Sequence, residues 1–446
     1  MKPMKAILSM FLVLILCFST TVVVSAESTG TTPDGFEYII KDGTATITGY
    51  TGEESEIIIP DKINDNIVTI IGEKAFYFKH KITKVKIPDT VTILENEAFY
   101  GCDMLEEINL PKSLEFIGKE VLCYSVIDSI EIPNSTFICA ELDIENHYDG
   151  NTYTRYERGP FKECDNLSNI TFAEGVTRIP DNLFAGLTAL ESINIPDTVT
   201  TISARAFYNC KKLTKLGYPN NWATVTRYSS SYSAESPFVG CTSLKEIIVD
   251  EGTTYIPALA FLNQTSIERL ILPDSLETIG SEAFHNATAL SSIDFGNGIK
   301  IIENDAFNRC TSLTEIDLPD SLITIGSGAF ADCTGIKGVT IPEKITTISS
   351  HTFANCTGLE YVNLPDELIT INAYAFENCL FEEIDIPDTV TTVVARAFYN
   401  CKKLSKVGYP KNWSSVPRYS TSYAAESPFV GCTSLKEITV DDGVTF

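Results

Sequence analysis

The chain has 446 residues, and 59 Asp and Glu against 33 Lys and Arg give it a formal net charge of −26. A polyanion of this charge is repelled by nucleic acids and by anionic membrane surfaces. The composition therefore argues against nucleic-acid binding.

The first 26 residues have the pattern of a secretory signal peptide. A positively charged N-terminal region with Lys2 and Lys5 precedes an apolar run over 6–18, which is shorter than a typical transmembrane helix. Ala26 supplies the small residue that signal peptidase requires, so we expect cleavage before Glu27. The predictions are a secreted, extracellular protein and no membrane insertion after cleavage.

Residues 27–70 lack the regular pattern of the later chain. Two alternating runs, 36–40 and 44–48, flank an Asp42-Gly43 pair, which is a strong hairpin-turn signal. A stack of strands needs its first open edge covered. We interpret this hairpin as the N-terminal cap of the domain that occupies 71–446.

A unit of 23 residues repeats through the rest of the chain. Residues 313–335 read LTEIDLPDSLITIGSGAFADCTG, and 336–358 follow the same plan. We call the Phe of its Ala-Phe pair the marker; it occurs fourteen times, and Leu122 takes the fifteenth place. The marker Phe residues are Phe76, Phe99, Phe161, Phe184, Phe207, Phe238, Phe261, Phe284, Phe307, Phe330, Phe353, Phe376, Phe398 and Phe429. A fixed period of this length is typical of a solenoid.

The spacing inside one unit predicts a β-rich coil. Ile316 and Leu318 lie two apart, as one face of a strand requires, and Pro319 ends the strand because it cannot donate to a ladder. Leu322 and Ile325 begin a second apolar segment that ends at the marker. No helix-length amphipathic run fits between these points. The sequence therefore predicts about 15 coils with parallel strands, tight turns and short 3₁₀ pieces.

Three units carry inserts, near 138–160, 217–237 and 408–428. The last two are almost identical and lie 191 residues apart, so a block of several coils is duplicated. Exposed aromatic loops of this kind could stack on sugar rings or anchor a protein partner; alternatively, their rings pack on their own coil. The candidate ligand-binding residues are Trp222, Arg227, Tyr228, Tyr232, Trp413, Arg418, Tyr419 and Tyr423.

Ten cysteines occupy the same place, three residues after the marker. Disulfides are common in secreted proteins, but side chains in a ladder lie parallel and do not point at one another. We therefore predict a ladder of buried free thiols. The sequence shows no metal-ligand spacing and implies no cofactor. These cysteines are Cys102, Cys164, Cys210, Cys241, Cys310, Cys333, Cys356, Cys379, Cys401 and Cys432.

The outward face of the predicted strands is a second candidate surface. Its polar residues could bind a partner or cations, or form a solvated face. They include Asn109, Glu131, Asn194, Asp294, Asp317, Asn363 and Asp385. The four histidines are scattered and none lies in a nucleophile or metal motif, so we expect no enzymatic activity.

The unit IPDTVTTI, followed by Ala-Phe and a Cys three residues on, resembles the BspA-like leucine-rich repeat family, which is also found in treponemal surface proteins. The resemblance covers nearly the whole mature chain. It implies a leucine-rich repeat arc on a bacterial surface that adheres to host matrix or to other cells. It transfers no catalytic residue.

Three functions follow as hypotheses. The first is a secreted or cell-surface adhesin that binds proteins of a host or neighbouring cell. The second is a carbohydrate-binding module that uses the aromatic inserts. The third is a spacer for a further C-terminal domain, because the chain stops inside a repeat and we expect the protein to continue past Phe446.

Overall fold

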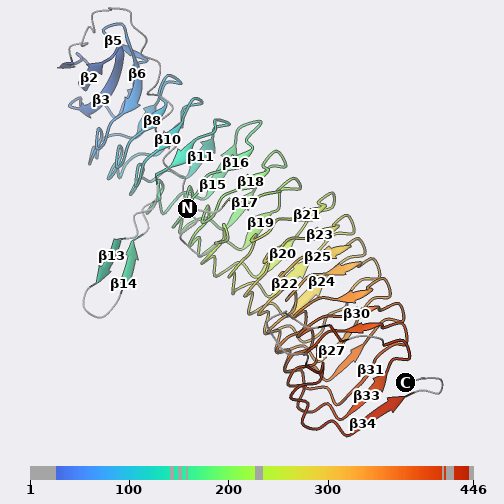
Figure 1. Ribbon diagram of the computed structural model, residues 1–446. Helices are drawn as coiled ribbons and strands as arrows, with labels where there is room; N and C mark the ends of the chain where they lie inside the picture. The colour runs from blue at the N-terminus through green and yellow to red at the C-terminus, as the bar shows by residue number, and fades with distance from the viewer. Residues whose placement is uncertain are drawn as a thin grey trace, which may run out of the picture.

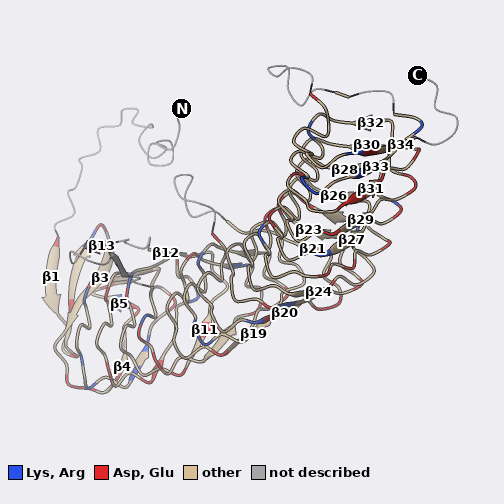
Figure 2. Cartoon of the chain, turned by 90° about the horizontal axis from the view of Figure 1, so that it is seen from below, with Lys and Arg blue, Asp and Glu red and all other residues tan. Residues whose placement is uncertain are grey.

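The computed structural model describes residues 27–140, 159–226, 235–413, 416–417 and 426–440, together with the backbone of two strands at 145–148 and 153–156. The predicted signal peptide lies outside the described residues. The described chain forms a curved solenoid of about 15 coils (Figures 1 and 2). The predicted β-solenoid is confirmed.

The N-terminal strands form one end of the solenoid. Strand β2 (Phe36–Lys41) pairs antiparallel with β3 (Thr44–Tyr50) around Asp42 and Gly43, and β1 (Ser28–Thr31) pairs with β2. Strand β3 then pairs in parallel with β6 (Asn66–Ile71), which pairs with the short β5 (Lys62–Ile63). The sheet of the first coils thus continues directly from the hairpin.

The first ladder consists of the strands that precede proline in most coils. Neighbouring strands pair in parallel, as in Lys84 opposite Glu107, and alternate residues such as Val85 are buried. Its strands are β4 (Glu56–Ile58), β7 (Lys84–Lys86), β9 (Glu107–Ile108), β11 (Ser129–Ile132), β15 (Asn169–Phe172), β17 (Ser192–Asn194), β19 (Lys215–Gly217), β20 (Glu246–Ile248), β22 (Arg269–Ile271), β24 (Ser292–Asp294), β27 (Gly338–Thr340), β29 (Tyr361–Asn363), β31 (Glu383–Asp385), β33 (Lys406–Tyr409) and β34 (Glu437–Val440).

The second ladder lies in the segment between the proline turn and the marker. The sequence did not predict these strands, because each is only two residues long and shows no readable alternation. They are β8 (Ile93–Leu94), β10 (Phe116–Ile117), β12 (Ile138–Cys139), β16 (Arg178–Ile179), β18 (Thr201–Ile202), β21 (Tyr255–Ile256), β23 (Thr278–Ile279), β25 (Ile301–Ile302), β26 (Thr324–Ile325), β28 (Thr347–Ile348), β30 (Thr370–Ile371) and β32 (Thr392–Val393).

The marker Phe side chains form the central stack of the core. Phe284 and Phe307 are fully buried, with ring centroids 5.4 Å apart and ring planes 3° apart. Burial of each ring contributes about 1.5–3 kcal/mol to stability. The stack is interrupted at Leu122, which is also fully buried.

The cysteine ladder lies beside this stack. Cys102 donates its S–H to the backbone carbonyl of Phe76 in the preceding coil at 3.1 Å, and Cys333 does the same to Phe307 at 3.1 Å. The ten ladder cysteines are free thiols and repeat this bond from coil to coil. Burial raises the pKa of Cys102 and of Cys333 to about 12. The predicted thiol ladder is confirmed.

The marker turn closes each coil with an alternating backbone path. The N–H groups of Lys74, Phe76 and Phe78 donate to carbonyls of the next coil at 3.2, 2.8 and 2.8 Å. In most coils the residues two before and two after the marker have left-handed backbone, as in Glu282 (φ 57°) and Asn286 (φ 62°). This geometry makes a third hydrogen-bonded ladder along one edge.

Candidate interaction surfaces

All seven polar residues that the sequence placed on the outward strand face are exposed; six lie in or directly after a strand of the first ladder, and Asp317 lies in the coil that has no such strand. Several of them form hydrogen bonds to the neighbouring coil. The side chain of Asn109 accepts a hydrogen bond from the N–H of Ile87 and donates one to its carbonyl, and Asn363 donates to Thr340 at 3.0 Å. The same face carries cross-coil ion pairs, such as Arg269 with Glu246 at 3.1 Å. Many polar side chains of this face therefore already form hydrogen bonds or ion pairs with the neighbouring coil.

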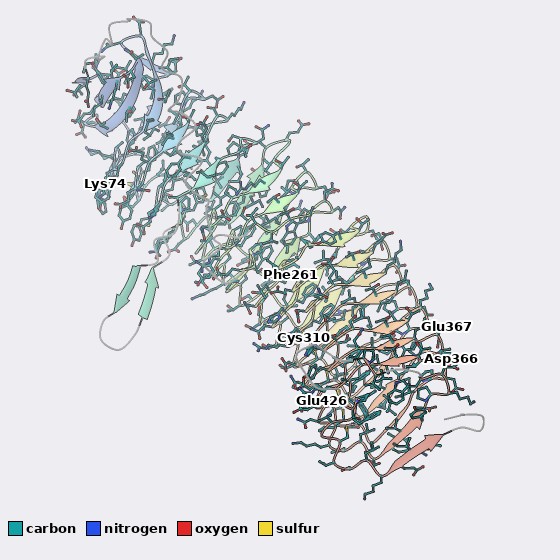
Figure 3. All side chains as sticks on the ribbon, in the orientation of Figure 1. Lys74, Phe261, Cys310, Asp366, Glu367 and Glu426 are labelled. Carbon is teal, nitrogen blue, oxygen red and sulfur yellow. The ribbon has the colours of Figure 1, made fainter. Side chains whose placement is uncertain are left out.

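An open hollow of about 480 Å³ lies at the end of this face near the C-terminus. Carboxylates of Asp366, Asp385 and Asp388 line it, and Lys411 approaches Asp388 to 3.0 Å. Figure 3 places Asp366 on the edge opposite to Glu426. Among the described residues, no group of three or more His, Cys, Asp or Glu could hold a metal ion.

The marker-turn edge is the opposite surface. We define it as the side chains two before, one after and two after each marker. Each insert ends directly before a marker, and the strands β13 (Glu145–Tyr148) and β14 (Tyr153–Tyr156) form a hairpin that projects from this side (Figure 1). Proline precedes the marker in the three coils that close an insert: Pro160, Pro237 and Pro428. Because proline disfavours the α regions for the residue before it, the left-handed turn is absent at Gly159, Ser236 and Ser427.

Each duplicated insert is held at its base by an ion pair. Arg205 binds Glu235 through two nitrogens, with Nη2 2.6 Å from Oε1, and its side chain is 2% exposed. Arg396 binds Glu426 in the same way, with Nη2 2.8 Å from Oε1. The hydrogen bond from Arg396 lowers the pKa of Glu426. Planar, bidentate pairs of this kind fix geometry as well as charge.

The two tryptophans differ in burial. Trp222 is 1% exposed, donates its indole N–H to the carbonyl of Thr224 at 3.0 Å, and packs against Phe238 and Phe261. Trp413 is partly buried against Tyr409 at 4.9 Å. The other six candidate ligand-binding residues lie outside the described residues: Arg227, Tyr228, Tyr232, Arg418, Tyr419 and Tyr423. Ligand binding by the inserts therefore stays a prediction.

The marker-turn edge also carries aromatic groups that sequence reasoning missed. The first aromatic cluster, on the coils before the first insert, consists of Tyr77, Phe78, Tyr100 and Tyr124, with successive ring centroids 4.5–5.6 Å apart. The third, before the last insert, consists of His351, Tyr374, Arg396 and Tyr399.

The second aromatic cluster is Arg205 and Tyr208, with the guanidinium 5.3 Å from the ring centroid. Aromatic side chains of the marker-turn edge therefore precede every insert, as clusters before the first and the last and as a single ring, Tyr208, before the second. The signal was present in the sequence, because aligned units show Phe78 and Tyr124 where ten of the fifteen units have Asn or Gly.

The described residues contain no helix long and apolar enough to cross a membrane. Among curated proteins, no relative matches the chain. A family model, the BspA type leucine rich repeat region, matches residues 46–142, 154–236, 233–360 and 324–446.

Among solved structures, a leucine-rich repeat protein from Bacteroides ovatus is 24% identical with a TM-score of 0.54, and the match covers 94% of this chain and 100% of that chain. A leucine rich cell surface protein from Faecalibacterium prausnitzii is 22% identical with a TM-score of 0.30, covering 94% and 96%. The pneumococcal vaccine antigen PcpA is 18% identical with a TM-score of 0.40, covering 82% and 93%. The repeat unit, the stacked coils and the family match over most of the chain show that this protein belongs to the BspA type leucine-rich repeat family.

Proposed function

We propose that this protein is secreted or displayed on the cell surface and mediates adhesion by binding proteins of a host or neighbouring cell. The observation that carries the proposal is the marker-turn edge, where aromatic side chains precede each of three inserts on one scaffold. Aromatic and Arg side chains supply most of the binding energy in protein interfaces. Three such groups on one molecule would also permit avidity.

The strand face supports the proposal less well than the marker-turn edge. Its charged side chains are largely engaged with neighbouring coils, as in Lys245 with Glu268 at 2.9 Å and Lys406 with Glu437 at 3.6 Å. A partner would have to displace these pairs and desolvate both charges. We therefore assign the primary binding surface to the marker-turn edge.

The test measures binding of residues 27–446 to a panel of extracellular-matrix proteins and of glycans. Saturable binding to a matrix protein supports adhesion through proteins. Binding to glycans alone would instead support the carbohydrate-binding module. No saturable binding to either panel would contradict both and leave a spacer role.

A second set of variants locates the surface on the inserts without disturbing the buried Trp222. Alanine replaces Arg227, Tyr228 and Tyr232 in one variant and Arg418, Tyr419 and Tyr423 in another. Loss of binding in either variant supports a role of that insert. Unchanged binding in both would remove the inserts from the proposed surface.

A further inference from the structure

The first aromatic cluster contains two residues that local structure does not explain. Phe78 and Tyr124 have left-handed backbone, with φ 53° and 68°, and their side chains remain 45% and 48% exposed. At the same position the other coils mostly carry Asn or Gly, which tolerate this backbone far better than a bulky side chain does. Neither backbone preference nor burial therefore favours an aromatic ring here.

The ring of Phe78 packs on Gly101 of the next coil. A Cβ on Gly101 would be 2.4 Å from Cδ1 of Phe78, so this glycine leaves the room in which the ring rests. The ring plane is at 82–83° to those of Tyr77 and Tyr100, which stack on each other at 5.2 Å. The Phe78 ring thus packs on Gly101 and has His80 at 5.6 Å, and its side chain still remains 45% exposed.

In the second and third clusters, Tyr rings of the marker-turn edge already form cation–π contacts with Arg side chains. Arg396 lies 5.9 Å from the Tyr374 ring and 5.4 Å from the Tyr399 ring, and Arg205 lies 5.3 Å from Tyr208. At the same position, two before the marker, the first cluster has one cation and two carboxylates: Lys74, Glu97 and Glu120. Lys74 lies over Tyr77 at 5.6 Å. In the described part of the chain, no Lys or Arg lies over the ring of Phe78 or Tyr124, although the imidazole of His80 lies 5.6 Å from the Phe78 ring.

The charge of the molecule favours a basic partner for these rings. The chain carries a net charge of −26, and the carboxylates of Glu73 and Asp103 flank the cluster, where both stay more than half exposed although they lie 3.7 Å from Lys74 and 2.9 Å from His80. A second copy of the chain would meet long-range repulsion, whereas a cationic segment would be attracted. Cations over aromatic faces add a directional interaction at short range.

We propose that the first aromatic cluster is a docking site for an Arg- or Lys-bearing segment of a partner protein, whose cation stacks on Phe78 and Tyr124. This inference rests on the proposed protein-binding function and specifies its partner. It predicts binding that weakens as salt is added, because both the steering and the contact are electrostatic.

The experiment selects 12-residue peptides from a random phage library on residues 27–446, with counter-selection on the double variant Phe78→Asn, Tyr124→Asn. This variant installs the Asn that other coils carry at that position, so we expect it to fold, and an unchanged urea midpoint checks that loss of binding is not loss of structure. The expected result is enrichment of peptides that contain Arg or Lys. Their Kd should rise about tenfold in the double variant and when Arg is replaced by its neutral isostere citrulline.

A matched control removes an exposed aromatic ring from the strand face. Tyr361 is 55% exposed on β29, and Tyr361→Asn should leave peptide binding unchanged. Enriched peptides without basic residues, or binding that is equal in the double variant, would overturn the inference. A neutral oligosaccharide that requires Phe78 and Tyr124, or self-association that requires them, would overturn it as well.

The same variants separate this inference from the proposed function. If a matrix protein binds the wild type and the double variant equally, adhesion stands and the first aromatic cluster is not the site. If no matrix protein or peptide binds the wild type, both proposals fail.

Discussion

At the residue scale, the molecule depends on side chains that tolerate left-handed backbone at each marker turn. Asn286 (φ 62°) also donates its side-chain amide to Asn263 at 3.0 Å, so neighbouring coils are linked by an amide ladder. Asp332, Asn355 and Asn378 continue such a ladder at 2.8 and 2.7 Å. The sequence shows that Asn recurs two residues after the marker, but only the structure shows that the backbone there is left-handed.

We expect Asn286→Ala to lower the free energy of unfolding by about 1–2 kcal/mol. Alanine disfavours the left-handed φ of 62° because of its Cβ, and it lacks the polar side chain through which Asn tolerates this backbone. Asn286→Gly should cost less, since Gly adopts positive φ freely. Urea unfolding of both variants measures the difference. Equal costs would show that the amide ladder, and not the backbone, determines the residue.

The thiol ladder makes stability depend on pH. Burial raises the pKa of Cys102, Cys164 and Cys333 to about 12, above the value of about 8.5 in an unfolded chain. Above pH of about 8.5 the unfolded state therefore loses protons that the folded state keeps, and stability falls as pH rises toward 12. Each such thiol contributes a slope of about 1.4 kcal/mol per pH unit.

Urea unfolding between pH 7 and 10 measures this slope, and Cys333→Ala reports the share of one thiol. The variant should flatten the decline although it introduces a small cavity. A stability that is independent of pH across this range would contradict the account.

At the element scale, the sequence predicted the coil well and its edges poorly. Ile316 and Leu318 are buried, as their spacing predicted, but the strand predicted there is wrong: in the described chain the first ladder has no strand between β24 and β27. The second ladder and the marker turn escaped prediction, because two-residue strands carry too little pattern and left-handed residues are not confined to Asn and Gly. The inserts were recognised, but Trp222 contributes to the core whereas Trp413 stays partly exposed.

The duplicated inserts allow a matched comparison of the two tryptophans. We expect Trp222→Ala to destabilise its coils by about 3–5 kcal/mol, because a fully buried ring leaves a large cavity. Trp413→Ala should cost less, since its ring is already partly hydrated. Thermal unfolding of each variant measures the two costs, and an equal loss would contradict the difference in packing.

At the scale of the whole molecule, stability is a sum of contacts between neighbouring coils. One junction lies at the first insert, where Leu122 interrupts the Phe stack and the sheet of the second ladder that ends at β12 gives way to a new one at β16. Strands β11 and β15 still bridge this junction in the first ladder. The second ladder is also divided between β18 and β21 and between β26 and β28. The family and its solenoid could be inferred from the repeat alone, whereas the aromatic clusters required the coils to be stacked.

The junction at the first insert predicts that unfolding is not two-state. Both tryptophans lie on the C-terminal side of it, so their fluorescence reports on those coils, whereas far-UV circular dichroism reports on the whole array. The two probes should give different urea midpoints. Coincident transitions would show that the coils before and after the first insert unfold together, and would contradict this prediction.

The central claim is that partners bind the marker-turn edge. Hydroxyl-radical footprinting of residues 27–446, with and without a matrix protein found in the panel, tests it directly. The account predicts that oxidation of Phe78 and Tyr124 falls in the complex while oxidation of Tyr361 on the strand face is unchanged. Protection of Tyr361 with no change at Phe78 and Tyr124 would place the partner on the strand face and contradict the account.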